Sequence, residues 1–140
     1  MFSIKVFLAT SNDLRNCRKF DTEISTDVLL KQINEQRVLL LSGNSQVIGY
    51  LRYSLFWSSI PYVDLIHVGE EFRRKGSGKT LYVFLEKYLK QQGFKKLMAS
   101  AQSNEPDAQN FHKKIGFELI GSLSKLNHDE SDEIFFLKAL

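Results

Sequence analysis

The residues best suited to chemistry lie between Val68 and Leu81, where a strand pattern passes through a glycine-containing loop into helical periodicity. The first N–H groups of a helix have no intrahelical acceptor, and they carry the positive end of the helix dipole. Gly76 and Gly78 let the backbone approach a ligand closely. Positive charge is added by Arg73, Arg74, Lys75 and Lys79. The segment predicts a phosphate or pyrophosphate site, and the alternative is an ordinary turn with solvated basic residues.

Two other phosphate-binding patterns do not fit this loop. A Walker A motif needs a glycine where the sequence has Arg73, and 140 residues is short for that fold. A dinucleotide fingerprint needs a third glycine where the sequence has Leu81, and it normally follows an early strand. Both interpretations are rejected.

The positive charge of the chain is concentrated around the same loop. Residues 73–97 hold eight Lys or Arg against one Glu, whereas the remaining residues hold eleven against fifteen acidic residues. Concentrated positive charge attracts anions, although a solvated helix face explains the pattern equally well. Nucleic-acid binding is disfavoured because the basic residues coincide with the predicted phosphate loop and the rest of the chain is acidic.

A third phosphate-loop pattern fits the sequence. It requires Arg or Gln, two residues, Gly, one residue, and then Gly or Ala, all following a strand. Arg73, Gly76 and Gly78 satisfy it, and the predicted strand segment Ile66–Val68 ends five residues before the arginine.

Further signals of the same kind follow downstream. Asn104 stands seven residues before Phe111, and Phe111 begins an aromatic-x-x-x-x-Gly-Phe motif that ends at Phe117. These motifs occur in the right order over residues 46–120. Together they make the sequence resemble the GNAT acyltransferase superfamily.

The resemblance implies binding of an acyl-CoA, usually acetyl-CoA. Its pyrophosphate would contact the backbone N–H groups of residues 74–79, and its pantetheine would pair like an extra strand with residues 66–68. Such pairing is also physically reasonable, because an extended ligand that carries amide groups can satisfy the hydrogen bonds of strand N–H and C=O groups that have no partner strand. Asn104 would contact the pantetheine, with a turn or capping role as the alternative. The implied cofactor contacts are Ile66, His67, Val68, Arg73, Arg74, Lys75, Gly76, Ser77, Gly78, Lys79, Asn104 and Phe111.

Phe111 departs from the family pattern. Family members commonly carry Tyr at this position, whose hydroxyl is proposed to protonate the departing CoA thiolate, and Phe has no proton to donate. A thiol has a pKa near ~8.5, so its thiolate can leave without a general acid, whose help is typically worth ~10² to 10⁴ in rate. Water or His112 could substitute, although His112 is expected on the helix surface.

An acceptor amine must lose a proton before it attacks a thioester. Asp64 is the candidate base or amine-binding residue, because it shares strand parity with Ile66 and Val68 and the resembled family often has an acidic residue on this strand. A hydrogen bond at the strand end is the structural alternative. His67 is expected on the opposite face unless a bulge interrupts the strand.

The acceptor pocket is predicted near the same strand. Tyr53, Trp57 and Tyr62, with Ser58 beside them, are candidate substrate contacts, although aromatic residues in this pattern also serve sheet packing. The acidic segment 129–133 favours a cationic acceptor such as a polyamine, aminoglycoside or lysine side chain, and a solubilising loop is its alternative.

The elements that must position these residues follow from periodicity, capping and turn residues. Helices are expected after caps at 11–13, at 26–34, from 78 to a cap at Gly93, and from Pro106 to a cap at Gly116. Strands are expected at 3–9, 37–42, 46–57, 62–68, 94–101, 117–123 and 133–138. The strand-helix-strand order from 62 to 101 implies a parallel crossover. The predicted class is α/β, with a mixed central sheet flanked by helices, and the resemblance adds splayed parallel strands around the CoA site.

Length and composition limit the remaining alternatives. A chain of 140 residues with 43% apolar residues predicts a single domain over 1–140. The one cysteine, Cys17, cannot form an internal disulfide, which favours a reducing, cytoplasmic compartment. Neither a membrane span nor a secretion signal is predicted. The three histidines lack ligand spacing, so no metal site is expected.

The sequence is therefore interpreted as an N-acyltransferase that moves an acetyl group from acetyl-CoA to a primary amine of a small molecule or protein, by direct attack in a ternary complex. The alternative is a catalytically weak or inactive CoA-binding or interaction module, which Phe111 makes plausible. No nucleic-acid or membrane partner is expected, and the choice between a monomer and a homodimer is left open.

Overall fold

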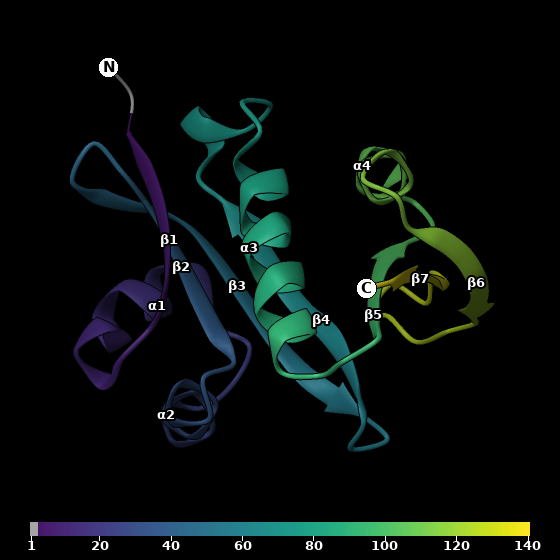
Figure 1. Ribbon diagram of the computed structural model, residues 1–140. Helices are drawn as coiled ribbons and strands as arrows, with labels where there is room; N and C mark the ends of the chain where they lie inside the picture. Colours follow the sequence, from purple (N-terminus) through teal and green to yellow (C-terminus); the bar gives the residue numbers. More distant parts are fainter. Residues whose placement is uncertain (1–2) are drawn as a thin grey trace. The chain divides into compact units, whose positions relative to one another are not determined.

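The computed structural model describes residues 3–140, and its helices and strands follow the predicted order (Figure 1). Within these residues, seven strands form one mixed sheet in the order β1-β2-β3-β4-β5-β7-β6. The predicted α/β class is therefore confirmed. The chain divides into two compact units: unit 1 comprises the residues through Ser54 and Asp64–Tyr88, and unit 2 comprises Leu55–Val63 and Leu89–Leu140.

Unit 1 is built on an antiparallel arrangement of β1, β2 and β3. The β2–β3 turn has positive φ at Asn44 and Ser45, and it joins the strands expected at 37–42 and 46–57. The strands are β1 (Ile4–Leu8), β2 (Val38–Gly43), β3 (Gln46–Phe56) and β4 (Ile60–Val68), and the helices are α1 (Leu14–Phe20), α2 (Thr26–Asn34) and α3 (Ser77–Gln91).

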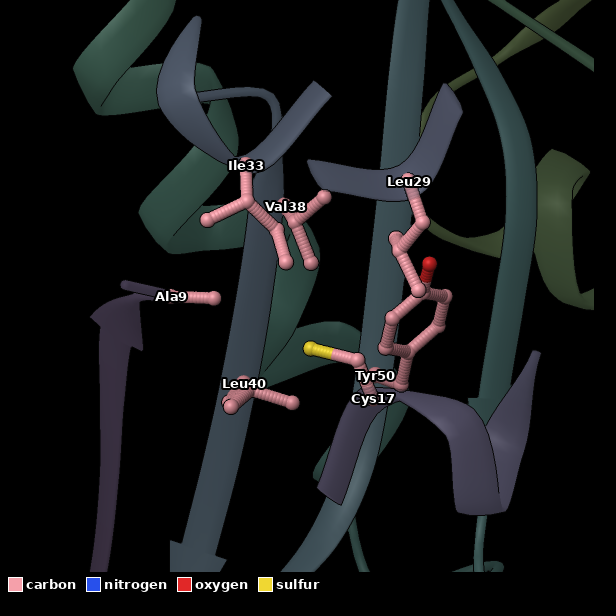
Figure 2. Packing of buried hydrophobic residues seen from close by; sticks show 7 residues of the cluster. All are labelled: Ala9, Cys17, Leu29, Ile33, Val38, Leu40 and Tyr50. Carbon is pink, nitrogen blue, oxygen red and sulfur yellow. The ribbon is translucent and has the colours of Figure 1, made fainter. Parts of the chain in front are cut away.

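Helices cover both faces of this part of the sheet. On one face, Cys17 of α1 and Leu29 of α2 pack against Tyr50 in a fully buried cluster (Figure 2). On the other face, α3 comes close to β3 at Gly49, where an added Cβ would lie 3.4 Å from the side chain of Leu81. Successive strand residues alternate between these faces, so the two apolar layers follow from period-two patterning.

Unit 2 contains the remaining strands and one helix. Strand β4 pairs parallel with β5, and Tyr62, near the start of β4, lies opposite Met98. Strand β7 pairs antiparallel with both β5 and β6. Gly116 has a φ of 103°, as expected for the cap predicted there. The elements are β5 (Lys96–Gln102), α4 (Pro106–Lys114), β6 (Glu118–Leu123) and β7 (Glu133–Ala139).

A buried charge network connects the elements of unit 1. Asp21, directly after α1, is fully buried and accepts hydrogen bonds from the Tyr50 hydroxyl at 2.5 Å and from Arg52 Nε at 2.7 Å. Arg52 also lies 3.5 Å from a carboxylate oxygen of Asp64 on β4 and 3.7 Å from one of Glu23. Burial alone would raise the pKa of Asp21, but the bonds from Tyr50 and Arg52 hold this pKa below its ordinary value. The network keeps both charges ionised inside the unit.

We expect Arg52→Met to destabilise the protein strongly, because it leaves the buried carboxylate of Asp21 without its cation. Removing one partner of a buried pair costs about 3–5 kcal/mol. The matched control is Arg37→Met, since Arg37 pairs with Glu35 at 3.3 Å on a more exposed part of the chain and should lose less than about 1 kcal/mol. Urea unfolding measures both, and equal losses would contradict the structural role given to Arg52.

Candidate functional site

The glycine loop predicted from the sequence connects β4 to α3. After β4 ends at Val68, the Arg73 side chain folds back and its Nε donates to the Val68 carbonyl at 2.9 Å. Arg74 and Gly76 both adopt left-handed backbone conformations, with φ of 61° and 81°. The helix begins at Ser77. Left-handed residues in a turn before a helix are typical of loops whose N–H groups bind anions.

Local hydrogen bonds hold the start of α3 in place. The buried Ser77 hydroxyl donates to the Phe72 carbonyl at 3.0 Å, and Thr80 donates to the Gly76 carbonyl through its backbone N–H at 2.9 Å and its hydroxyl at 2.8 Å. No atom lies within 4 Å of a Cβ built on Gly76, so the space beside the loop is open. Helix geometry leaves the N–H groups of the first turn without intrahelical acceptors. The loop can therefore bind a phosphate group through its backbone.

The predicted strand segment Ile66–Val68 forms the end of β4 and leads directly into this loop. Ile66 and Val68 are half-buried, while His67 is more exposed and packs its ring against Phe20 of α1 at 5.6 Å. Burial and, secondly, the charge of Arg73 lower the pKa of His67. A neutral imidazole at this position is compatible with an apolar or amide-bearing neighbour.

Asp64, the candidate base, lies in the charge network of unit 1. Its side chain is 22% exposed and its Oδ2 lies 3.5 Å from Arg52. Burial raises the pKa of Asp64, and this effect outweighs the hydrogen bond from Ser54 and the charge of Arg52, which lower it. A raised pKa makes the carboxylate a stronger base than an exposed aspartate.

The expectation that Asp64 and His67 lie on opposite faces of β4, unless a bulge interrupts the strand, can be compared with their contacts. Asp64 reaches Arg52, which is bonded to the same Asp21 carboxylate as Tyr50, and His67 reaches Phe20, whose ring stacks on Tyr50. Leu65 packs against the same apolar cluster. Asp64, Leu65 and His67 therefore all have neighbours in the layer that surrounds Tyr50.

Asn104 and Phe111 lie on either side of the first turns of α4 in unit 2. Asn104 is exposed in the turn before the helix, and its Nδ2 donates to an Asp129 carboxylate oxygen at 2.9 Å. Phe111 is half-buried and meets the ring of His112 edge-on, with centroids 5.4 Å apart. The structure thus gives Asn104 a turn position with a contact to the acidic segment, and its predicted cofactor contact stays a prediction.

His112 is not the surface residue expected from its place on the helix. It is 4% exposed, its ring stacks on Phe136 at 5.5 Å, and its Nδ1–H donates to the Ala108 carbonyl at 2.8 Å. Burial lowers the pKa of His112, against the hydrogen bond to Ala108, which raises it. Sequence reasoning missed this because the strand that covers the histidine, β7, comes more than twenty residues later. Because its ring is buried and its Nδ1 is engaged by the Ala108 carbonyl, His112 is poorly suited to replace the missing tyrosine as a proton donor.

The three predicted acceptor contacts differ in their surroundings. Tyr53 belongs to unit 1 and is 5% exposed, and its hydroxyl donates a hydrogen bond to the Gln36 carbonyl at 3.3 Å. These contacts are those of a residue that packs the sheet. Trp57 in the β3–β4 turn of unit 2 is 79% exposed, and Tyr62 of the same unit stacks on Phe135 at 6.0 Å. Only the latter two lie near open surface.

Sequence reasoning missed a polar chain in unit 2. The Tyr62 hydroxyl and Ser100 Oγ are 2.6 Å apart, Ser100 Oγ donates to Glu133 Oε2 at 2.6 Å, and Asn127 Nδ2 donates to Glu133 Oε1 at 3.0 Å. Antiparallel pairing sets Ser100 opposite Phe135, two residues from Glu133 on the same face. Only the strand register could have indicated this chain from the sequence.

An apolar cavity of about 370 Å³ opens on the same face of unit 2. It lies between the β3–β4 turn and strands β5, β6 and β7, and its walls are almost entirely apolar. Trp57, Ile60, Met98, Leu123, Phe135 and Leu137 are among the residues that line it.

Over residues 3–140, no three His, Cys, Asp or Glu side chains are grouped so that they could hold a metal ion. Over the same residues, no helix has both the length and the apolar character needed to cross a membrane.

The model of the Acetyltransferase (GNAT) family matches residues 7–117. The chain belongs to the GNAT acetyltransferase family. No curated protein matches its sequence. Solved structures share the GNAT fold: Ard1 from Thermoplasma volcanium is 18% identical, with a TM-score of 0.86 over 98% of this chain and 97% of that one.

Two other GNAT structures are similar over nearly the whole chain. The ribosomal-protein-alanine N-acetyltransferase from Brucella melitensis is 20% identical, with a TM-score of 0.84 over 97% of this chain and 99% of that one. A putative streptothricin acetyltransferase from Bacillus anthracis str. Ames, solved in complex with acetyl coenzyme A, is 19% identical, with a TM-score of 0.84 over 99% of both chains. At these identities the likeness concerns the fold.

The burial of His112 predicts a pH dependence of stability in this GNAT chain. The histidine stays neutral when folded but gains a proton near pH ~6.5 when unfolded, so lowering the pH from about 7 toward 5 favours unfolding. We expect His112→Phe to lose less stability than the wild type over this interval. Urea midpoints at the two pH values measure the difference, and identical losses in both proteins would show that His112 does not titrate as its burial requires.

Proposed function

We propose that this GNAT chain is an acyl-CoA-dependent N-acetyltransferase that transfers the acetyl group of acetyl-CoA to a primary amine. The observation that carries the proposal is the β4–α3 loop, where left-handed residues at Arg74 and Gly76 precede the first turn of α3. Membership of the GNAT family supports the same reading. Converging backbone N–H groups at a helix start suit a phosphate-bearing cosubstrate.

Acetyl-CoA is proposed to bind with its pyrophosphate on the N–H groups of residues 74–79. The exposed side chains of Arg74, Lys75 and Lys79 would add positive charge, and the open space beside Gly76 leaves room for the phosphates. The pantetheine would lie along Ile66–Val68. The family resemblance adds Asn104 and Phe111 as further contacts. The related protein from Bacillus anthracis was solved with acetyl coenzyme A.

The proposed chemistry is direct attack in a ternary complex. The neutral amine nitrogen attacks the thioester carbonyl, its proton passes to a base, and the carbon–sulfur bond breaks to release the CoA thiolate. Cys17 does not suit an acyl-enzyme, because it is fully buried and burial raises the pKa of its thiol to about 12. We also infer a cytoplasmic setting, since this cysteine is unpaired.

Asp64 is proposed as the base or amine-binding residue. Burial raises its pKa and strengthens it as a base, while the nearby Arg52 favours the ionised form. Phe111 supplies no acid and His112 is buried, so the thiolate is proposed to leave without protonation by either residue. Loss of the acid is tolerable because a thiolate is a stable leaving group.

We expect Gly76→Ala to weaken acetyl-CoA binding at least tenfold, because an L-residue resists the left-handed backbone that shapes the loop. Gly93→Ala is a matched control: Gly93 also has a positive φ, 93°, and no atom within 4 Å of an added Cβ. Both variants should lose about 1–2 kcal/mol of stability, but only the first should lose binding. Calorimetric titration measures the affinity, and equal affinities in the two variants would remove the loop from the cosubstrate site.

Wild-type protein mixed with acetyl-CoA and a panel of primary amines should release CoA thiol, and Asp64→Asn should lower this rate most near neutral pH. The defect should shrink as rising pH supplies neutral amine, because the base is then no longer needed. Asp27→Asn, which changes an exposed aspartate on α2, is the control.

A loss in Asp64→Asn that does not vary with pH would assign Asp64 to positioning through Arg52 instead of proton transfer. If wild-type protein binds acetyl-CoA but acetylates no amine, the CoA-binding module is the better description of the chain.

A further inference from the structure

The apolar cavity and the polar chain of unit 2 lie along one continuous strand face. On β7, Leu137 and Phe135 line the cavity, and Glu133 is the next residue on the same face. Residues two apart on a strand are about 6.5–7 Å from each other. A small molecule that fills the cavity near Phe135 can therefore reach the carboxylate of Glu133.

Glu133 is suited to bind a positive group. It is half-buried, and its two oxygens accept one hydrogen bond each, from Ser100 at 2.6 Å and Asn127 at 3.0 Å. A carboxylate has about four acceptor sites, so capacity remains. Among the ion pairs of the described residues, none joins Glu133 to a Lys or Arg. The acidic residues of segment 129–133 add negative charge nearby.

The end of the cavity that lies away from Glu133 is positively charged. Lys96, the first residue of β5, lines the cavity and is exposed, and Lys95 joins it in the adjoining recess. A polyamine that extended from Glu133 into the cavity would carry a second ammonium group over apolar walls or toward Lys96. Both placements inside the cavity are unfavourable, because burying an unpaired charge is costly and like charges repel. The cavity therefore favours an apolar group over a second ammonium.

We propose that this face of unit 2 selects the acceptor, and that the acceptor is a primary amine joined to a bulky apolar group. The amine docks at Glu133 as its ammonium ion and loses this proton to a base before it attacks the thioester, while the apolar group fills the cavity next to Phe135 and Leu123. This inference rests on the proposed function, which it narrows from any amine to hydrophobic amines. Two sources share this chemistry: a free arylalkyl amine, and a peptide N-terminus whose first side chain is large and apolar.

The site has a built-in reporter, because Trp57 lines the cavity and is the one tryptophan of the chain. We expect phenethylamine to change the fluorescence of Trp57 in a saturable way. Ethanolamine lacks the apolar group, phenylpropionate lacks the ammonium group and spermidine carries extra charge, so all three should bind at least tenfold more weakly. Comparison of the peptides Phe-Ala-Ala-Ala-amide and Gly-Ala-Ala-Ala-amide tests the peptide source.

Matched variants separate the two halves of the site. Leu123→Ser places a polar side chain in the cavity wall, and its control is Leu126→Ser, which changes an exposed leucine outside the wall. Glu133→Gln removes the charge while keeping the size, and its control is Glu130→Gln in the same acidic segment. We expect Leu123→Ser and Glu133→Gln each to weaken phenethylamine binding about tenfold, with both controls unchanged. Leu123 is 52% exposed, so its variant should fold.

The outcomes distinguish this inference from the proposed function. Saturable phenethylamine binding without acetylation of any amine supports the site and defeats the proposed function. Acetylation of spermidine without a Trp57 response to phenethylamine defeats the site and keeps the function. Equal binding of phenylpropionate and phenethylamine would show that Glu133 does not select charge. A chain that elutes as a dimer, with Trp57 shielded and unresponsive, would make the cavity an interface between copies.

Discussion

The buried guanidinium of Arg52 is the constraint on which most of unit 1 depends. A cation that is only 7% exposed must be matched by negative charge, and Asp21, Glu23 and Asp64 supply it. Asp21 and Glu23 come from the segment after α1, and Asp64 comes from β4. Their ion pairs with Arg52 of β3 therefore connect the helix layer to β3 and β4. The candidate base is consequently part of the structural network. Burial raises its pKa, and the charge of Arg52 opposes this rise.

The candidate cosubstrate loop depends on backbone conformation more than on side chains. Arg73 is held by the Val68 carbonyl and Ser77 by the Phe72 carbonyl, so two polar residues of the motif serve the loop's own shape. The left-handed residues at Arg74 and Gly76 then direct the chain into α3. Glycine at the second position follows from this geometry, whereas Arg74 adopts it at a steric cost. The proposed phosphate contact would therefore use backbone N–H groups whose directions are set by the loop's own hydrogen bonds.

Local patterns in the sequence predicted most of the elements and the loop, because strand alternation, helix periodicity and glycine caps act over a few residues. The prediction for α2 and the caps at Gly93 and Gly116 agree with the structure for this reason. The error concerns long-range packing: His112, expected on the helix surface, is covered by β7. The contact of Ser100 with Glu133 likewise needed the strand register, which composition and periodicity do not contain.

The absence of a tyrosine at position 111 bears on which amines can react. Because neither Phe111 nor the buried His112 is suited to act as the acid, the proposed reaction would depend more heavily on the supply of neutral amine and on the stability of the thiolate. At pH 7 about one α-amino group in seven is neutral, against roughly one alkylammonium group in 2,500, given pKa values near ~7.8 and ~10.4. An α-amino acceptor therefore depends less on deprotonation by a carboxylate base such as Asp64. Of the two sources of a hydrophobic primary amine, the peptide N-terminus is thus the one that needs less base catalysis.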